Sequence, residues 1–99
     1  MMDWEQKNAE DGRLVILKEL AQQIDGRLNE VSIQHVLDAF AIKRSRQWIR
    51  TQLLKLKELE AVRVSEAGTV MIAQITSLGR NHVERREIID GVSRPSDDA

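Results

Sequence analysis

The stretch LNEVSIQHVLDAFAIKRSRQWIRTQLLKLKELEAVRV, residues 28–64, decides the fold of this chain. It contains two amphipathic patterns separated by a short connection. The first begins at Ser32 and repeats apolar residues at i, i+3, i+4 and i+7, namely Ile33, Val36, Leu37 and Phe40. The second has Ser45 as its N-cap and a buried stripe of Ile49, Leu53, Leu56 and Leu59. The spacing predicts two helices joined by a tight turn.

A further helix is predicted upstream of this pair. Its apolar positions have helical spacing, at Leu14, Leu17, Leu20, Ala21 and Ile24. It starts either at a cap near Asn8 or Asp11 or, as one continuous helix, after Asp3, because Gly12 weakens an unbroken helix. Asp25-Gly26 ends it, and residues 27–29 form a short extended piece.

From Val62 onwards, the spacing of apolar residues changes from the helical period to a period of two residues, which is typical of a β-strand. Residues 62–65 and 69–75 are predicted to pair as a β-hairpin around a turn at 66–68. Thr76 caps a last helix, from about Ser77 to Ile89. The predicted fold is therefore mainly α with a small β-hairpin, in the order α-β-α-α-β-β-α, which is the layout of a winged helix-turn-helix.

Length and composition predict a single domain. We assign it to residues 1–90, in which residues 1–10 extend the first helix if that helix is continuous, and expect residues 91–99, GVSRPSDDA, to be a flexible tail. The chain has no cysteine, its N-terminal residues lack the apolar core of a secretory signal, and no apolar run is long enough to span a bilayer. These features predict a cytoplasmic protein that has no contact with a membrane.

Positive charge is concentrated in one segment. Residues 43–57 contain six basic side chains and no acidic one, whereas the whole chain has a formal net charge of −1. Because exposed charges are screened beyond about 8–10 Å, the local charge governs an encounter with phosphate groups. A solvated helix face is the alternative interpretation of such a run.

An enzyme is not expected. His35 and His82 are not at metal-ligand spacing, and no glycine-rich loop is present to cradle phosphate. We therefore predict no catalytic residues, no metal and no cofactor.

The segment of residues 28–64 resembles the helix-turn-helix and first wing strand of MarR- and ArsR-type bacterial repressors. LKLKELEAV, residues 54–62, resembles the end of their recognition helix, with Glu60 where they usually have glycine. ITSLGRNHVE, residues 75–84, is similar to the entry into their last helix. RLVILKELAQ, SRQWIRTQL, ITSLGR and GVSRP also resemble small winged-helix proteins of Mu-like prophages, which have no established role.

The resemblance implies that the third helix, about residues 45–58, lies in the major groove of double-stranded DNA. The predicted base contacts are Arg46, Gln47, Arg50 and Thr51, and the predicted phosphate contacts are Lys43, Arg44, Ser45, Lys55 and Arg63. Trp48 is expected to brace the helix rather than to stack on a base. A homodimer is expected, formed by the first and last helices and by Ile88, Ile89 and Val92.

These observations favour a phage-encoded transcriptional regulator that binds duplex DNA. The alternative is a winged-helix adaptor that binds other proteins during phage morphogenesis or DNA packaging. The acidic flanks and Glu66 at the hairpin turn favour the adaptor, and the basic helix favours DNA. DNA binding requires guanidinium groups that are not already occupied by carboxylates of the same chain.

Overall fold

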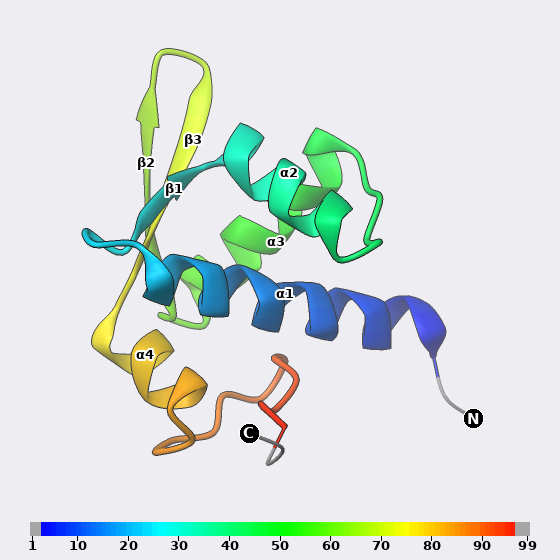
Figure 1. The fold of residues 1–99 in the computed structure, drawn as a ribbon, viewed down its shortest axis with the longest axis vertical. Helices are drawn as coiled ribbons and strands as arrows, with labels where there is room; N and C mark the ends of the chain where they lie inside the picture. The colour runs from blue at the N-terminus through cyan, green and yellow to red at the C-terminus, as the bar shows by residue number, and fades with distance from the viewer. Residues whose placement is uncertain (1–2, 97–99) are drawn as a thin grey trace.

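The computed structural model describes residues 3–96 and forms a small α+β domain (Figure 1). Four helices and a three-stranded antiparallel sheet make up this described part of the chain. In chain order the elements are α1 (Trp4–Gln22), β1 (Arg27–Asn29), α2 (Glu30–Ala39), α3 (Arg46–Glu58), β2 (Val62–Ala67), β3 (Val70–Ile75) and α4 (Ser77–Val83). The predicted order of helices and strands is confirmed.

The first helix is the continuous one of the two alternatives. The Asp3 carboxylate caps α1 by accepting hydrogen bonds from the amides of Glu5 and Gln6, at 3.1 and 3.3 Å. Gly12 does not interrupt the helix, because α1 packs there against the Trp48 indole of α3. A Cβ at position 12 would lie 2.9 Å from Trp48 Cη2. Glycine therefore lets the two helices approach, and Trp48 braces the core as predicted.

The second helix begins two residues earlier than predicted. Asn29, and not a residue at position 32, is its N-cap, and its side chain accepts from the Ser32 amide at 2.9 Å. The third helix begins where the sequence predicts, since Ser45 Oγ accepts from the Trp48 amide at 3.0 Å. The earlier start of α2 matters for the site because it places Glu30 in the first helical turn.

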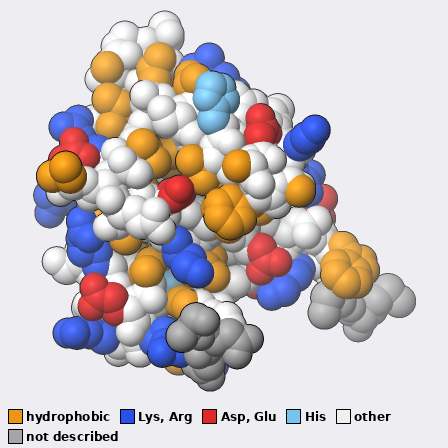
Figure 2. Space-filling view, viewed as in Figure 1, with side chains coloured by type: hydrophobic (Ala, Val, Ile, Leu, Met, Phe, Trp, Pro, Cys, Tyr) orange, Lys and Arg blue, Asp and Glu red, His pale blue; other side chains and the backbone are white. Residues whose placement is uncertain are grey.

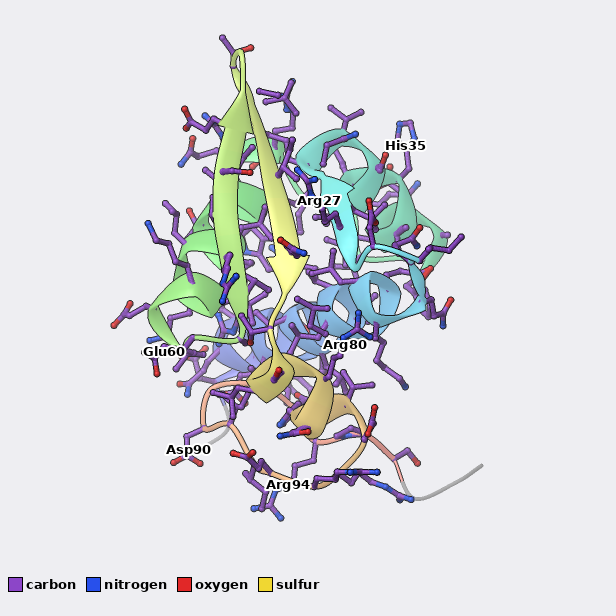
Figure 3. All side chains as sticks on the ribbon, turned by 90° about the vertical axis from the view of Figure 1, so that its left-hand side faces the viewer. Arg27, His35, Glu60, Arg80, Asp90 and Arg94 are labelled. Carbon is purple, nitrogen blue, oxygen red and sulfur yellow. The ribbon has the colours of Figure 1, made fainter. Side chains whose placement is uncertain are left out.

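Beyond α3, Glu60 adopts the left-handed conformation that glycine favours, with φ of 65°. Its side chain points into solvent at the end of the helix (Figure 3). The chain then reverses direction into β2. A glutamate thus occupies a turn whose geometry matches the glycine found in the resembling repressors.

The sheet is larger than the predicted hairpin. β2 pairs with β3 from Val62↔Ile75 to Ala67↔Val70, around a turn in which Gly68 has φ of 62°. β1 adds a third strand by pairing with β3 on its other edge, so the strand order is β1-β3-β2. The core lies between this sheet and the helices, and its fully buried members include Leu17, Leu20, Leu37, Ile49, Leu53, Leu56 and Ala73.

The last helix is shorter than predicted and ends at Val83 instead of Ile89. The chain leaves it through Arg85, whose φ is 64°. Buried His82 then holds the following segment on both sides: its Nδ1 accepts from the Ile89 amide at 3.1 Å, and its Nε2 donates to the Ser93 carbonyl at 2.9 Å. Two hydrogen bonds from one ring thus direct residues 84–93 back onto α1.

This return corrects two predictions about the C-terminal segment. Residues 91–96 are not a free tail, because Val92 is 5 % exposed and the Gly91 carbonyl accepts from Arg13 Nε at 2.7 Å. Residues 97–99 lie outside the described part of the chain. Ile89 and Val92 belong to the chain's own core, so of the three residues expected at a dimer surface only Ile88 is exposed. Asp90 and Arg94 mark the segment in Figure 3.

Candidate nucleic-acid interface

The N-terminal half of α3 and the β2–β3 hairpin form one continuous structure around Glu30. The hairpin extends away from the helices, and α3 packs between α2 and β2 (Figure 1). Among the predicted contact residues, Lys43, Arg46, Gln47, Thr51 and Arg63 are exposed. Ser45 is also exposed, but its hydroxyl oxygen is occupied as the helix cap.

Glu30 is completely buried and joins three elements through its two carboxylate oxygens. Oε2 accepts a short hydrogen bond from the Met71 amide of β3. Oε1 accepts from Arg46 Nε at 3.1 Å, and Arg50 Nε lies 3.3 Å from the same oxygen without alignment for a hydrogen bond. A single carboxylate therefore connects the start of α2, the first turns of α3 and the hairpin.

The environment keeps this buried carboxylate ionised. Burial by itself raises the pKa of Glu30, because the charged form is lost from water. The Met71 hydrogen bond and the nearby Arg46 and Arg50 act in the opposite direction and outweigh it, so the pKa of Glu30 is below its ordinary value. At neutral pH the cluster is one anion shared by two cations.

Three of the predicted arginine contacts are therefore not free of carboxylates, which corrects the sequence-based expectation. Arg44 Nη1 lies 3.2 Å from Glu5 Oε1 of α1, and its guanidinium stands 5.1 Å from the centre of the Trp48 ring. Arg50 also donates from Nη2 to the Thr69 carbonyl of the hairpin at 3.3 Å. Arg46 differs from both, because only its Nε edge is occupied and 47 % of its side chain is exposed.

The remaining predicted contacts differ in how accessible they are. Gln47 is exposed. The Thr51 hydroxyl donates to the Gln47 carbonyl one turn earlier, so its proton is occupied while its oxygen can still accept a hydrogen bond. Lys55 is partly buried on α3, and Arg63 is exposed on β2.

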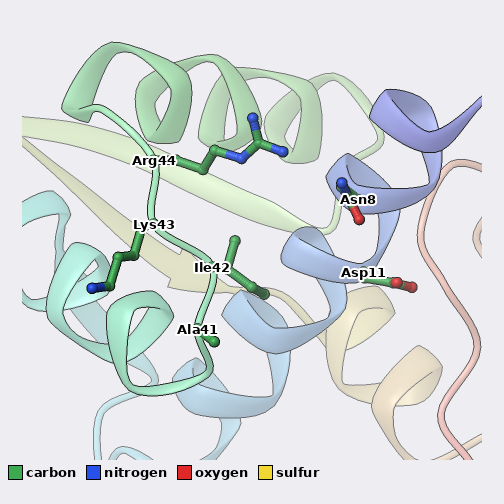
Figure 4. A pocket seen from close by; sticks show the side chains of 6 residues that line it. All are labelled: Asn8, Asp11, Ala41, Ile42, Lys43 and Arg44. Atoms are coloured by element: carbon green, nitrogen blue, oxygen red, sulfur yellow. The ribbon is translucent and has the colours of Figure 1, made fainter.

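A pocket lies beside this surface, between α1 and the turn that joins α2 to α3. It is lined by Asn8, Asp11, Ala41, Ile42, Lys43 and Arg44. Figure 4 shows Arg44 pointing towards Asn8 across the pocket, whereas Lys43 points away from α1. Arg44 therefore faces α1, and Lys43 is the cation of this turn that stays exposed.

On the face of the molecule drawn in Figure 2, neither positive nor negative charge covers a large region. Basic, acidic and hydrophobic side chains alternate across this face. Exposed apolar side chains are scattered, with Trp4 at 69 % and Phe40 at 60 % exposed.

Sequence reasoning missed the polar side chains that organise the site. Glu30 was not identified, although a glutamate directly after a capping asparagine is favourable in a first helical turn. Arg13 and Gln52 were also missed; Arg13 Nη1 donates to Gln52 Oε1 at 2.5 Å in the interior. Only the position of Gln52 between the apolar residues Ile49 and Leu53 could have indicated its burial.

Residues 3–96 contain neither a cluster of metal-ligating side chains nor a membrane-spanning helix. Within this range, His, Cys, Asp and Glu side chains do not cluster in threes that could hold a metal ion. Over the same residues, the helices are too short or too polar to cross a membrane.

Comparison with known proteins identifies one relative that extends along most of the chain. The "Uncharacterized protein gp26" of Escherichia phage Mu is 36 % identical over 86 residues, which cover 87 % of this chain and 88 % of the phage protein. No protein-family profile matches the chain, and no solved structure matches it.

Proposed function

We propose that this chain, which belongs to the same family as the phage Mu protein gp26, is a winged helix-turn-helix protein that binds duplex DNA. In this assignment α2 and α3 are the helix-turn-helix and the β2–β3 hairpin is the wing. The phage origin of the relative supports a phage-encoded protein, and transcriptional regulation is the role that we propose for it.

One observation carries the proposal: the first turn of α3, which Glu30 joins to the β2–β3 hairpin, presents exposed Arg46 and Gln47, and exposed Lys43 precedes it. An α-helix fits the major groove of B-DNA, where arginine can pair with guanine and glutamine with adenine. Lys43 and Arg63 are exposed cations suited to phosphate, whereas Arg44 is directed towards α1. Glu30 neutralises only part of the positive charge, because its one negative charge faces both Arg46 and Arg50, and Arg46 keeps N–H donors that Glu30 does not occupy.

A homodimer is part of the proposal. One monomer offers few accessible cations, and two copies of α3 could enter successive major grooves about 34 Å apart. Exposed Ile88 and Trp4 supply apolar surface outside the DNA-facing region. Light scattering is expected to give twice the monomer mass at high concentration, and a strict monomer would remove this part of the proposal.

Salt titration of binding to a random-sequence duplex tests the proposal. Each neutralised phosphate contributes about −0.9 to the slope of log K against log salt, so three to four accessible cations per chain predict a slope of about −3 to −4 for each bound chain, and about −5 to −7 for a dimer. Lys43→Ala should make this slope shallower by about 1 for each bound chain. Lys18→Ala, which removes an exposed lysine of α1, is the control and should leave it unchanged.

A protein–protein adaptor in phage morphogenesis or DNA packaging is the second candidate. Internal pairing of Arg44, Arg46 and Arg50 favours it, because these contacts reduce the charge available to phosphate. Leu54, 48 % exposed on α3, would suit a protein partner better than a DNA backbone. An adaptor predicts no duplex binding even at low salt.

A further inference from the structure

We propose that Glu30 is a positioning residue that gives the two arginines of α3 different tasks, with Arg46 reading a base and Arg50 bracing the wing. This inference rests on the proposed DNA-binding function and deepens it. It differs from the sequence-based expectation, in which Arg46 and Arg50 are equivalent base contacts.

The first step is the orientation of Arg46. Its Nε donates to Glu30 Oε1, so this contact uses the side edge of the planar guanidinium and leaves open the end edge, which the two Nη groups form. Within the described residues the Arg46 Nη groups have no protein partner, and 47 % of the side chain is exposed. These two groups form the fork that binds O6 and N7 of guanine. Because Glu30 is buried and also held by the Met71 amide, it cannot follow a mobile side chain into solvent.

The second step is the different environment of Arg50. Its Nε faces the same carboxylate oxygen, but its Nη2 donates inward along the hairpin to the Thr69 carbonyl. Two of its nitrogens are thus directed towards the protein, and its side chain is less exposed than that of Arg46. Thr69 directly follows the hairpin turn at Gly68, and Met71, two residues on, donates to Glu30. Arg50 and Glu30 together tie the strand that leaves the turn to α3.

The third step is the consequence for recognition. A pre-oriented arginine loses less side-chain freedom on binding, so its contact discriminates more strongly between bases. Arg50, which is bound to the hairpin, does not reach base edges, so its contribution to affinity is the same for every DNA sequence. Loss of the Glu30 charge should therefore weaken base preference at one position without removing the cations that bind phosphate.

Selection of bound sequences from a random duplex pool, followed by affinity measurements on the selected duplex, tests this division. Arg46→Ala should reduce the preference at one base pair by about 5- to 150-fold, since one bidentate contact discriminates by about 1–3 kcal/mol. Arg50→Ala should leave every base preference in place and lower affinity for selected and random duplexes by the same factor. The opposite pattern, with base preference lost in Arg50→Ala and kept in Arg46→Ala, would overturn the proposal.

Glu30→Gln tests the positioning role itself. It should weaken preference at the base pair that depends on Arg46 while keeping the salt slope of the wild type. If this substitution leaves the chain unfolded, Glu30→Asp, which keeps the charge but shortens its reach, replaces it and should weaken the same preference. Unchanged preference in a folded variant would overturn the positioning role.

Nuclear magnetic resonance spectra of the wild type and the Glu30 variant distinguish a failure of this inference from a failure of the proposed DNA-binding function. In the free protein, the Arg46 Nε–H and Met71 N–H signals should both move in the Glu30 variant, whether or not DNA binds. If they do not move, the clamp is absent and the inference fails while DNA binding can stand. If they move but the wild type binds no duplex at low salt, the proposed function fails, and Glu30 has a structural role only.

Discussion

Replacement of Glu30 by glutamine should strongly destabilise the protein at neutral pH. The substitution keeps the shape of the side chain but removes a fully buried charge that faces Arg46 and Arg50. Breaking a buried ion pair by removing one partner costs about 3–5 kcal/mol. We expect a value near the lower end, about 3 kcal/mol, because 47 % of Arg46 and 33 % of Arg50 already face water and can be hydrated.

Urea unfolding at pH 7, followed by circular dichroism, measures this change in the free energy of unfolding. For a domain of this size the corresponding fall in Tm is about 10–25 °C. Glu58→Gln, at an exposed glutamate on the end of α3, is the matched control and should stay within about 0.5 kcal/mol of the wild type. If Glu30→Gln behaves like this control, the cluster does not stabilise the fold and the reasoning is refuted.

The same pair of proteins predicts a specific pH dependence. The pKa of Glu30 is lowered in the folded protein, so the unfolded state takes up the proton first as the pH falls. The stabilisation from ionised Glu30 is complete above the ordinary glutamate pKa of about 4.3 and is lost as the pH falls through the lower folded-state value. Wild type should therefore lose more stability than Glu30→Gln between about pH 5 and pH 3. An equal loss in both proteins would contradict the lowered pKa.

Three further substitutions test the backbone and the packing. Glu60→Gly should raise the free energy of unfolding by up to about 1 kcal/mol, because glycine adopts the observed φ of 65° without strain. In the same urea experiment the control Lys57→Gly, inside α3, should lower the free energy of unfolding by about 1 kcal/mol. Gly79→Ala should prevent stable folding, because a Cβ there would overlap the Ala61 carbonyl oxygen. A cooperative thermal transition like that of the wild type would contradict this close contact. Val92→Ala should lower the free energy of unfolding by about 1–3 kcal/mol in chemical denaturation, because Val92 packs in the core. Ile88→Ala, at an exposed position, is the control and should leave it unchanged; equal effects of the two substitutions would mean that the C-terminal segment does not pack on the core.

The fold could be predicted from the sequence wherever a local pattern has one physical solution. Helical spacing identified the buried stripe of α3, Ser45 located its start, and Gly68 located the hairpin turn. The glycine of the ITSLGR motif, Gly79, is required because the backbone of α4 passes too close to Ala61 to leave room for a side chain. Such features depend on neighbours in sequence or on a single small residue.

The rest depends on contacts between residues far apart in the chain. The end of α4 could not be found by periodicity, because His82 takes its partners from Ile89 and Ser93 after the helix has ended. The same limit applies to the candidate site. Arg46 and Arg50 were identified from the charge of their segment, but their common partner Glu30 lies on a different helix, and its burial depends on the Met71 amide of β3.

The central claim is that the start of α3 and the adjoining hairpin contact duplex DNA. Titration of isotope-labelled protein with a short duplex at low salt, followed by backbone and arginine side-chain resonances, tests it most directly. The account predicts that the largest shifts fall on residues 43–51 and 66–70, and that they weaken as salt is added. An unchanged spectrum, or shifts confined to α1 and residues 88–96, would contradict it.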